Sequence, residues 1–197
     1  MNQTGRLDQQ FAFLNEADKL KSVLRATTLC DGSRRENSGE HSWHLALYAL
    51  VLADQAAPGV SIDRVIKMLI LHDLVEIDVG DVPIHSAGGM AHGSAETAAA
   101  EARAADQIFW LLPADLRDGL RSLWDEFEAA VTQDAVFAKS LDRVQPVFAN
   151  LASGGGTWLE YNVTAEQLEA RVGVKIAKGA PGLWDWIREK TQVWFSS

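Results

Sequence analysis

Two apolar segments of helical length follow each other early in the chain, separated by a short stretch with Pro58 and Gly59. Residues 40–56, EHSWHLALYALVLADQA, are apolar on nearly every side of a helix. Residues 61–77, SIDRVIKMLILHDLVEI, form a second apolar pattern with Ser61 or Asp63 as the expected N-cap. Since a helix that is apolar all round is typical of a domain centre, the first segment predicts a central buried helix.

Helical patterns fill most of the remaining chain, and neither an alternating strand pattern nor an internal repeat stands out. The further expected helices span residues 9–24, 96–112, 114–130, 134–152, 164–176 and 179–195. Clusters of Gly, Ser and Asp predict loops at residues 27–39, 78–95 and 153–158. Pro146 is expected to kink or break its helix. The sequence therefore predicts an all-α fold in a single domain over residues 1–197.

Charge and composition exclude several classes of protein. The net charge of −9 would repel a nucleic-acid backbone, although a local cationic pocket could still bind a small phosphate. The single cysteine, Cys30, allows no internal disulfide and fits a reducing compartment. Since neither a signal peptide nor a membrane-spanning run is recognisable, a cytoplasmic protein without membrane contact is expected.

Ionisable residues interrupt the second apolar segment. On a helix, His72 and Glu76 share one face, and Asp73 lies about 100° round from His72. The other apolar helix contributes His41, and a later one contributes Asp142. Because imidazole and carboxylate groups both bind borderline divalent metals, three helices could meet at one ion.

A structural explanation of the same residues stands beside the metal site. A buried histidine is more often a hydrogen-bonded core residue than a ligand, and a His-Asp pair is common by chance. Asp142 lies next to Arg143 and three residues after Lys139, so it could simply form an ion pair. Spacing alone favours neither interpretation.

The combination of motifs is more specific than any one of them. The pattern EHSWHLAL…LILHDLVEIDVGDVP…KSLDRV, preceded by RRENSG, resembles the HD-domain metal-dependent phosphohydrolases, in particular the 5'-deoxynucleotidase branch. The resemblance implies an HD-domain helical bundle. It covers a core of about residues 11–152, and residues from about 153 to 197 resemble the C-terminal extension of bacterial members.

The resemblance also implies roles for individual residues. The implied metal ligands are His41, His72, Asp73 and Asp142. Glu76 corresponds to the catalytic residue, and Asp81 to a residue that positions substrate or water. His44 is interpreted as a core residue or a support for the ligands, and His85 and His92 as loop histidines or ligands of a second ion.

A phosphate-binding arginine is implied before the RREN loop. Arg25 is the first candidate, while Arg34 and Arg35 compete with it and Glu36 is expected to orient one of those two. In the deoxynucleotidases a Trp follows this arginine and helps to exclude a 2'-hydroxyl, but here the position is Ala26. Selectivity for deoxyribose is therefore an open question.

The implied activity is metal-dependent hydrolysis of nucleoside 5'-monophosphates, deoxynucleotides foremost, to nucleoside and phosphate. One divalent ion is expected, from among Co²⁺, Mn²⁺, Mg²⁺, Fe²⁺, Ni²⁺ and Zn²⁺, with Glu76 acting as acid or base. The alternatives are a hydrolase of cyclic nucleotides or alarmones, and a non-catalytic metal-stabilised dimer module. The resemblance implies a homodimer, and Trp184, Trp186 and Trp194 are expected in the core or at its interface.

Overall fold

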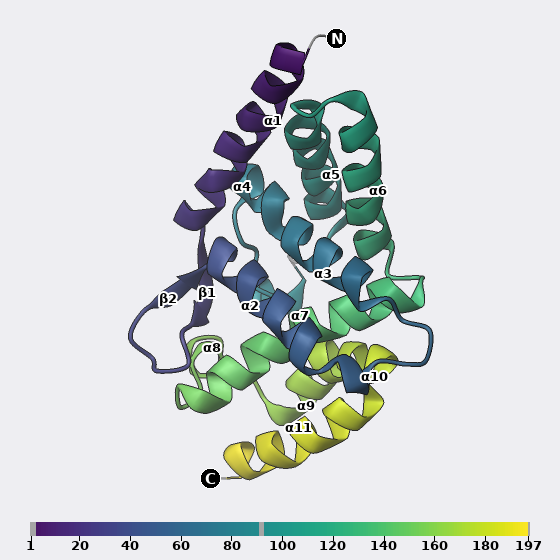
Figure 1. Ribbon diagram of the computed structural model, residues 1–197. Helices are drawn as coiled ribbons and strands as arrows, with labels where there is room; N and C mark the ends of the chain where they lie inside the picture. Colours follow the sequence, from purple (N-terminus) through teal and green to yellow (C-terminus); the bar gives the residue numbers. More distant parts are fainter. Residues whose placement is uncertain (1–2, 91–92, 197) are drawn as a thin grey trace.

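The computed structural model describes residues 3–90 and 93–196, and the predicted all-α fold is confirmed (Figure 1). The helices are α1 Gln3–Asp18, α2 Ser38–Val51, α3 Ile62–Leu71, α4 Glu76–Val79, α5 Ala95–Trp110, α6 Ala114–Ala129, α7 Gln133–Ala152, α8 Thr157–Glu160, α9 Ala165–Leu168, α10 Val174–Gly179 and α11 Pro181–Phe195. The strands are β1 Leu24–Thr28 and β2 Arg35–Asn37. Among the described residues, no helix is both long and apolar enough to cross a membrane.

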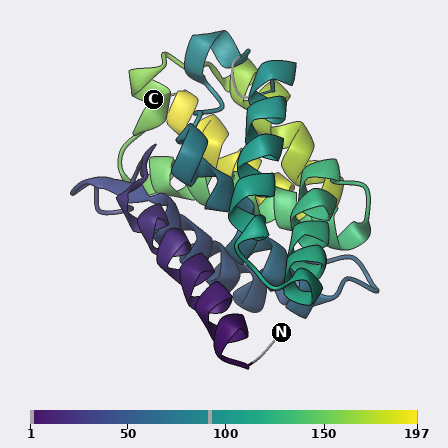
Figure 2. The ribbon, with the colours of Figure 1, turned by 90° about the horizontal axis from the view of Figure 1, so that it is seen from above.

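Helix α7 runs through the middle of the molecule and contacts α2, α3, α6, α10, α11 and β1 (Figure 1). The larger core cluster surrounds it and draws on residues both before and after residue 152, such as Leu45, Leu141 and Ile187. A second cluster, with Phe13 and Phe109, lies where α1, α5 and α6 meet. The two described ends of the chain lie on opposite sides of the molecule in both ribbon views (Figures 1 and 2).

A short β-hairpin was not predicted from the sequence. Strands β1 and β2 pair antiparallel in the expected loop region, with Leu24 opposite Asn37 and Thr28 opposite Arg35. Three consecutive residues of β1 are buried, so the strand shows no alternation of polar and apolar residues. The helix expected to reach residue 24 therefore ends at Asp18, followed by a 3-10 turn.

Helix α2 is only partly buried, contrary to the expectation of a central buried helix. Its inner face includes His41 and Leu45, but 66% of Trp43 and 60% of Leu50 are exposed. Its start agrees with the local sequence, because Asn37 and Glu40 form a capping box.

The second apolar segment is not one continuous helix. Helix α3 ends at Leu71, a 3-10 turn spans His72–Val75, and α4 follows to Val79. Ser61 is the N-cap residue of α3, as expected, but the Ser61 side chain makes no capping hydrogen bond. The tighter turn places the His-Asp pair at the end of α3, between α2 and α5, instead of in the middle of a helix.

The C-terminal third also departs from the expected boundaries. Helix α7 continues through Pro146, so the predicted break is wrong; its many buried neighbours offset the one backbone hydrogen bond that a proline removes. The expected helix over 164–176 is divided into α9, a π-helical turn and α10, although the predicted capping box of Thr164 and Gln167 is present.

Candidate metal and phosphate site

Four elements far apart in the sequence place the proposed functional residues together. Strand β1 carries Arg25, α2 carries His41, the 3-10 turn carries His72 and Asp73, and α7 carries Asp142. All five are at most 8% exposed. Since burying several ionisable groups is costly unless they pair or bind an ion, their contacts show what the cluster can hold.

His72 presents one ring nitrogen to the cluster. Its Nδ1 donates to the carbonyl oxygen of Leu69 at 2.8 Å, which directs Nε2 toward Asp73 Oδ1 at 2.9 Å and Asp142 Oδ1 at 3.7 Å. Nε2 is buried and makes no hydrogen bond of good geometry within the described chain. A buried nitrogen held in this way is a suitable metal ligand.

His41 faces the same point from α2. Its Nε2 lies 3.2 Å from Asp142 Oδ1, and its Nδ1 lies 3.1 Å from Gln145 Oε1. Three possible ligand atoms lie within 4.8 Å of one another, one each from His41, His72 and Asp73. This spacing would allow all three atoms to bind one cation. Asp142 adds an oxygen close to both imidazoles, so the donors present fit a divalent cation bound by nitrogen and oxygen.

The electrostatics of the cluster favour positive charge. Burial would lower the pKa of His72, but the carboxylates of Asp73 and Asp142 outweigh this effect and raise that pKa to about 10. The pKa of Asp142 is well below its usual value, because Arg143 and the two imidazoles outweigh its burial. A divalent cation bound here would replace the proton on His72 and would be attracted by the same two carboxylates, Asp73 and Asp142.

Glu76 and Asp81 border the cluster. Burial, together with the charges of Asp73 and Asp81, raises the pKa of Glu76 to about 8, although Arg25 opposes the shift. Ser38 donates a hydrogen bond to Glu76, and Asp81 accepts one from the backbone of Ala26 at 3.1 Å. Glu76 is therefore a carboxyl group able to hold or release a proton near neutral pH.

Arg25 joins the ligand cluster to Glu76. Its Nη1 lies 2.7 Å from Asp73 Oδ2 and 3.2 Å from Glu76 Oε1. Burial alone would lower the pKa of Arg25, but the carboxylates of Asp73, Glu76 and Asp81 raise it, so the guanidinium stays charged. A phosphoryl oxygen beside the ligands would meet this cation directly.

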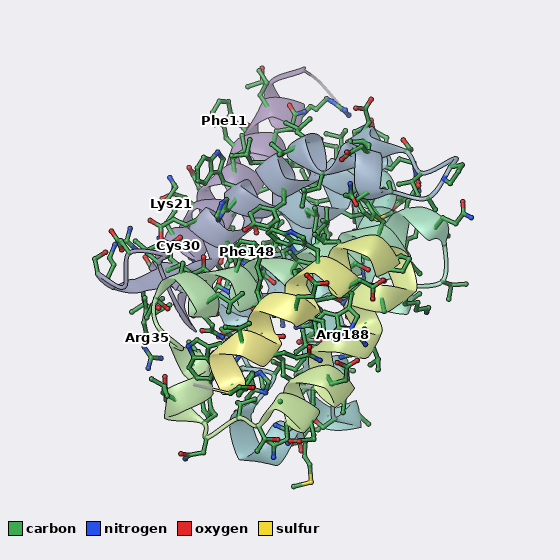
Figure 3. All side chains as sticks on the ribbon, turned by 90° about the horizontal axis from the view of Figure 1, so that it is seen from below. Phe11, Lys21, Cys30, Arg35, Phe148 and Arg188 are labelled. Atoms are coloured by element: carbon green, nitrogen blue, oxygen red, sulfur yellow. The ribbon has the colours of Figure 1, made fainter. Side chains whose placement is uncertain are left out.

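The two competing arginines lie elsewhere. Arg34 is paired with Glu40 at 2.6 Å, and Arg35 is paired with Glu160 at 3.0 Å. Figure 3 shows Arg35 at the edge of the molecule, and neither side chain lines the pocket described below. The carboxylate of Glu36 lies beside Arg25 instead, 3.6 Å from its Nε.

A pocket opens onto the cluster and encloses about 1020 Å³ of empty space, its opening to solvent included. Arg25, Asp73, Glu76 and Asp142 form its polar side. Further lining residues come from β1, α5, α6, α7, α8 and the segment between α4 and α5, and include Ala26, Thr27, Ile84, His85, Lys139, Arg143, Trp158 and Tyr161.

His44 and His85 lie outside the candidate ligand group. His44 Nδ1 is 3.5 Å from Gln145 Nε2, and burial lowers the pKa of His44. His85 is buried beside Arg171, and burial and that arginine lower its pKa to about 4. His92 lies outside the described residues.

Sequence comparison agrees with this geometry. A family profile described as an HD domain matches residues 17–184, which include every proposed ligand. The chain belongs to the HD-domain family. The candidate metal group in this chain is His41 together with the His-Asp pair of the 3-10 turn, and Asp142 of α7 lies beside it.

Solved and curated HD-domain relatives extend the comparison. A crystal structure of a predicted metal-dependent phosphohydrolase from Magnetospirillum magnetotacticum is 42% identical, with a TM-score of 0.88 and coverage of 96% of this chain and 95% of that one. Human 5'-deoxynucleotidase HDDC2 is 32% identical over 136 residues, 68% of this chain and 63% of that protein. The match thus spans less than two thirds of the human protein. A 5'-deoxynucleotidase from Shewanella oneidensis is 29% identical over 141 residues, 70% of this chain and 72% of that one.

Several contributors to the site escape sequence reasoning. Gln145 contacts both His41 and Glu36, and Ser38 contacts Glu76. Gln145 lies one turn after Asp142 on the same helix, and this spacing was the one sequence signal for it. No spacing rule predicts Ser38, because its partner lies 38 residues away.

Proposed function

We propose that the chain is a metal-dependent phosphomonoesterase that hydrolyses nucleoside 5'-monophosphates. One observation carries the proposal: a buried, charged Arg25 lies within 3.2 Å of both Asp73 and Glu76, at the polar end of the pocket. A cation for phosphate, a ligand carboxylate and a group that exchanges protons are thus side by side. The proposed ligands are His41, His72, Asp73 and Asp142.

The chain's own residues would divide the work of hydrolysis. A bound divalent ion would polarise the phosphate and lower the pKa of a water molecule. Arg25 would bind a phosphoryl oxygen and offset the charge that develops there. Water adds to phosphorus, the bond to the 5'-oxygen breaks, and Glu76 takes the proton from water or supplies one to the leaving oxygen. Asp81 would position substrate or water from the pocket wall.

The nucleotide is proposed because relatives of this chain are named 5'-deoxynucleotidases. Ala26 is part of the pocket wall, where its side chain is smaller than the Trp of the deoxynucleotidases and would exclude a 2'-hydroxyl less. We therefore expect wild-type protein to hydrolyse ribonucleotides and deoxyribonucleotides at comparable kcat/KM. Ala26→Trp should shift the ratio toward deoxyribonucleotides, which parallel assays with AMP and dAMP would measure.

The experiment for the activity is a substrate panel. Phosphate release is measured for nucleoside 5'-monophosphates, 3'-monophosphates, cyclic nucleotides and a pyrophosphorylated guanosine nucleotide, each with Co²⁺, Mn²⁺, Mg²⁺ or Zn²⁺. The proposal expects release from the 5'-monophosphates above all. Folded, metal-loaded protein that releases no phosphate from any of them would refute it, and hydrolysis of another class alone would support a different esterase.

We also propose that the chain forms a homodimer through helices α1 and α2. Large apolar side chains are exposed on both helices, including Phe11 and Leu14 on α1 and Trp43 and Leu50 on α2. Figure 3 shows Phe11 projecting outward from α1. A second copy of the chain packed on these helices would remove these side chains from water. In analytical ultracentrifugation, wild type should sediment as a dimer, and Trp43→Glu should dissociate at higher protein concentration. Wild type that sediments as a monomer would refute this proposal.

A further inference from the structure

Glu36 is one of the most deeply buried acids in the described chain, with 2% of its surface exposed. It lies on β2 next to Asn37, whose partner on β1 is Leu24, and Arg25 is the residue of β1 that follows Leu24. Asn37 follows and caps α2, and His41 comes one turn into that helix. The backbone therefore holds Glu36 between the proposed phosphate-binding cation and a proposed metal ligand.

The two carboxylate oxygens of Glu36 have different surroundings. Oε2 accepts a hydrogen bond from Gln145 Nε2 at 3.0 Å, which fixes the orientation of the group. Oε1 lies 3.3 Å from His41 Nδ1 and 3.6 Å from Arg25 Nε. Neither Oε1 nor Arg25 Nε has a hydrogen-bond partner of good geometry in the part of the chain described. A buried anionic oxygen is thus aimed at two N–H groups that it does not yet bind closely.

We propose that Glu36 is a positioning residue that couples the metal ligand His41 to the phosphate-binding Arg25. This inference rests on the proposed function of the same site. One carboxylate orients His41 through Nδ1, which directs Nε2 toward the ion, and holds Arg25 through Nε, which leaves Nη1 for phosphate. Contacts of this length shorten in many sites when the ligands bind.

The charges around Arg25 explain why Glu36 is needed. Asp73, Glu76 and Asp81 all approach Arg25 through Nη1, the atom that would meet the phosphate. In the working site Asp73 shares its charge with the ion and Glu76 exchanges a proton. Glu36 approaches from the Nε side, away from the atom that would meet the phosphate.

Gln145 alone cannot take over this role. Its Oε1 lies 3.1 Å from His41 Nδ1, so Gln145 and Glu36 share the single N–H of that nitrogen and both help to orient the imidazole. A neutral amide cannot balance the buried charge of Arg25. The coupling therefore predicts that loss of the Glu36 charge weakens metal binding and phosphate binding together.

The test compares Glu36→Gln with Glu40→Gln. The first keeps the side-chain volume and removes the charge. The second removes a nearby acid of α2 that pairs with Arg34, and a glutamine still serves its capping box. Co²⁺ is titrated into metal-free protein by its visible absorption, and inorganic phosphate is then titrated into the Co²⁺-loaded protein by the change in the same spectrum. Both readouts are independent of turnover.

E36Q is expected to bind Co²⁺ about tenfold to 100-fold more weakly and phosphate at least about tenfold more weakly, while E40Q matches wild type. Unchanged affinities in E36Q, or a loss in one affinity alone, would overturn the coupling. Wild type that binds Co²⁺ and phosphate but hydrolyses no nucleotide would refute the proposed function and leave this test valid.

A second variant covers failure of E36Q to fold. Gln145→Met removes the amide that holds Glu36 Oε2 and leaves the carboxylate charge in place. Because Glu36 would then be misplaced, this variant should bind both phosphate and Co²⁺ several-fold more weakly than wild type. Wild-type phosphate affinity in a folded Gln145→Met protein would contradict the inference.

Discussion

At the scale of single residues, the account separates groups that hold the ion from the group that moves a proton. His72 and Asp73 lie among the proposed ligand atoms, whereas Glu76 contacts Arg25 and Ser38 at the edge of the cluster. His72 and Asp73 in the 3-10 turn are thus proposed to bind the ion, and Glu76 at the start of the next helix is proposed to move a proton.

Glu76→Gln tests this separation. The variant should bind the ion with nearly unchanged affinity, because Glu76 is not among the ligands. Its kcat should fall by roughly 10²- to 10⁴-fold, the usual contribution of a positioned acid or base. Metal content and kcat are measured on the same preparation, with Glu40→Gln as the control. Wild-type turnover in Glu76→Gln would remove this residue from the mechanism.

The sequence predicts the site residues better than their contacts. His41, His72, Asp73 and Asp142 stand out because ionisable groups are rare in apolar helices, and the structure brings them together. The choice among Arg25, Arg34 and Arg35 depends on a strand that no sequence pattern revealed. Glu36 was expected beside Arg34 or Arg35 for the same reason, because the unpredicted hairpin brings it close to Arg25 instead.

At the scale of elements, the Gly154–Gly156 turn positions α8 at the pocket. All three glycines have positive φ values, from +41° to +115°. Asn150 then bonds Thr157 through its side chain, with Thr157 N 3.0 Å from Asn150 Oδ1. The turn thereby sets Trp158 and Tyr161 in the pocket wall.

Gly156→Ala should destabilise the protein more than Gly154→Ala. Both alanines would need a left-handed backbone, which costs about 1–2 kcal/mol. A Cβ at Gly156 would also overlap Asn150 Oδ1 and disturb its bonds to Thr157, at a further cost of about 1–3 kcal/mol, whereas none of the described atoms lies within 4 Å at Gly154. Urea unfolding of both variants measures the difference, and equal losses would show that the Asn150 contact is unimportant.

The burial of His85 makes the stability of the fold depend on pH. Its pKa falls from an ordinary 6.5 to about 4 in the folded chain, through burial and the charges of Arg171 and Arg143. Since the unfolded chain takes up the proton first as the pH falls, His85 stabilises the fold fully above about pH 6.5 and loses that contribution toward about pH 4.

His85→Gln should therefore flatten the pH dependence of stability. The slope between pH 6.5 and pH 5 should decrease by at most about 1.4 kcal/mol per pH unit, the value for one proton. Urea unfolding of metal-free wild type and variant, at matched pH values, measures this slope. A variant with the slope of wild type would show that His85 is not held neutral in the fold.

At the scale of the whole molecule, helical periodicity predicted the fold class and most helix positions. Residues 96–112 and 114–130 correspond closely to α5 and α6, because both are amphipathic and Pro113 separates them. The features that could not be predicted depend on contacts between residues far apart in the sequence. The hairpin requires that β1 packs against α7. The exposed face of α2 depends on which other helices pack against α2. The same long-range packing joins α2, the 3-10 turn and α7 around one point.

The central claim is that these distant elements build one metal site that supports nucleotide hydrolysis. The most direct measurement is phosphate release from dAMP by chelator-stripped protein as Mn²⁺ or Co²⁺ is added, for wild type and Asp142→Ala. Asp142 is chosen because it lies on a different element from the His-Asp pair. The account predicts no release without metal, release that saturates near one ion per chain in wild type, and loss of both metal binding and release in Asp142→Ala. Release by metal-free protein, or undiminished metal-dependent release by Asp142→Ala, would contradict it.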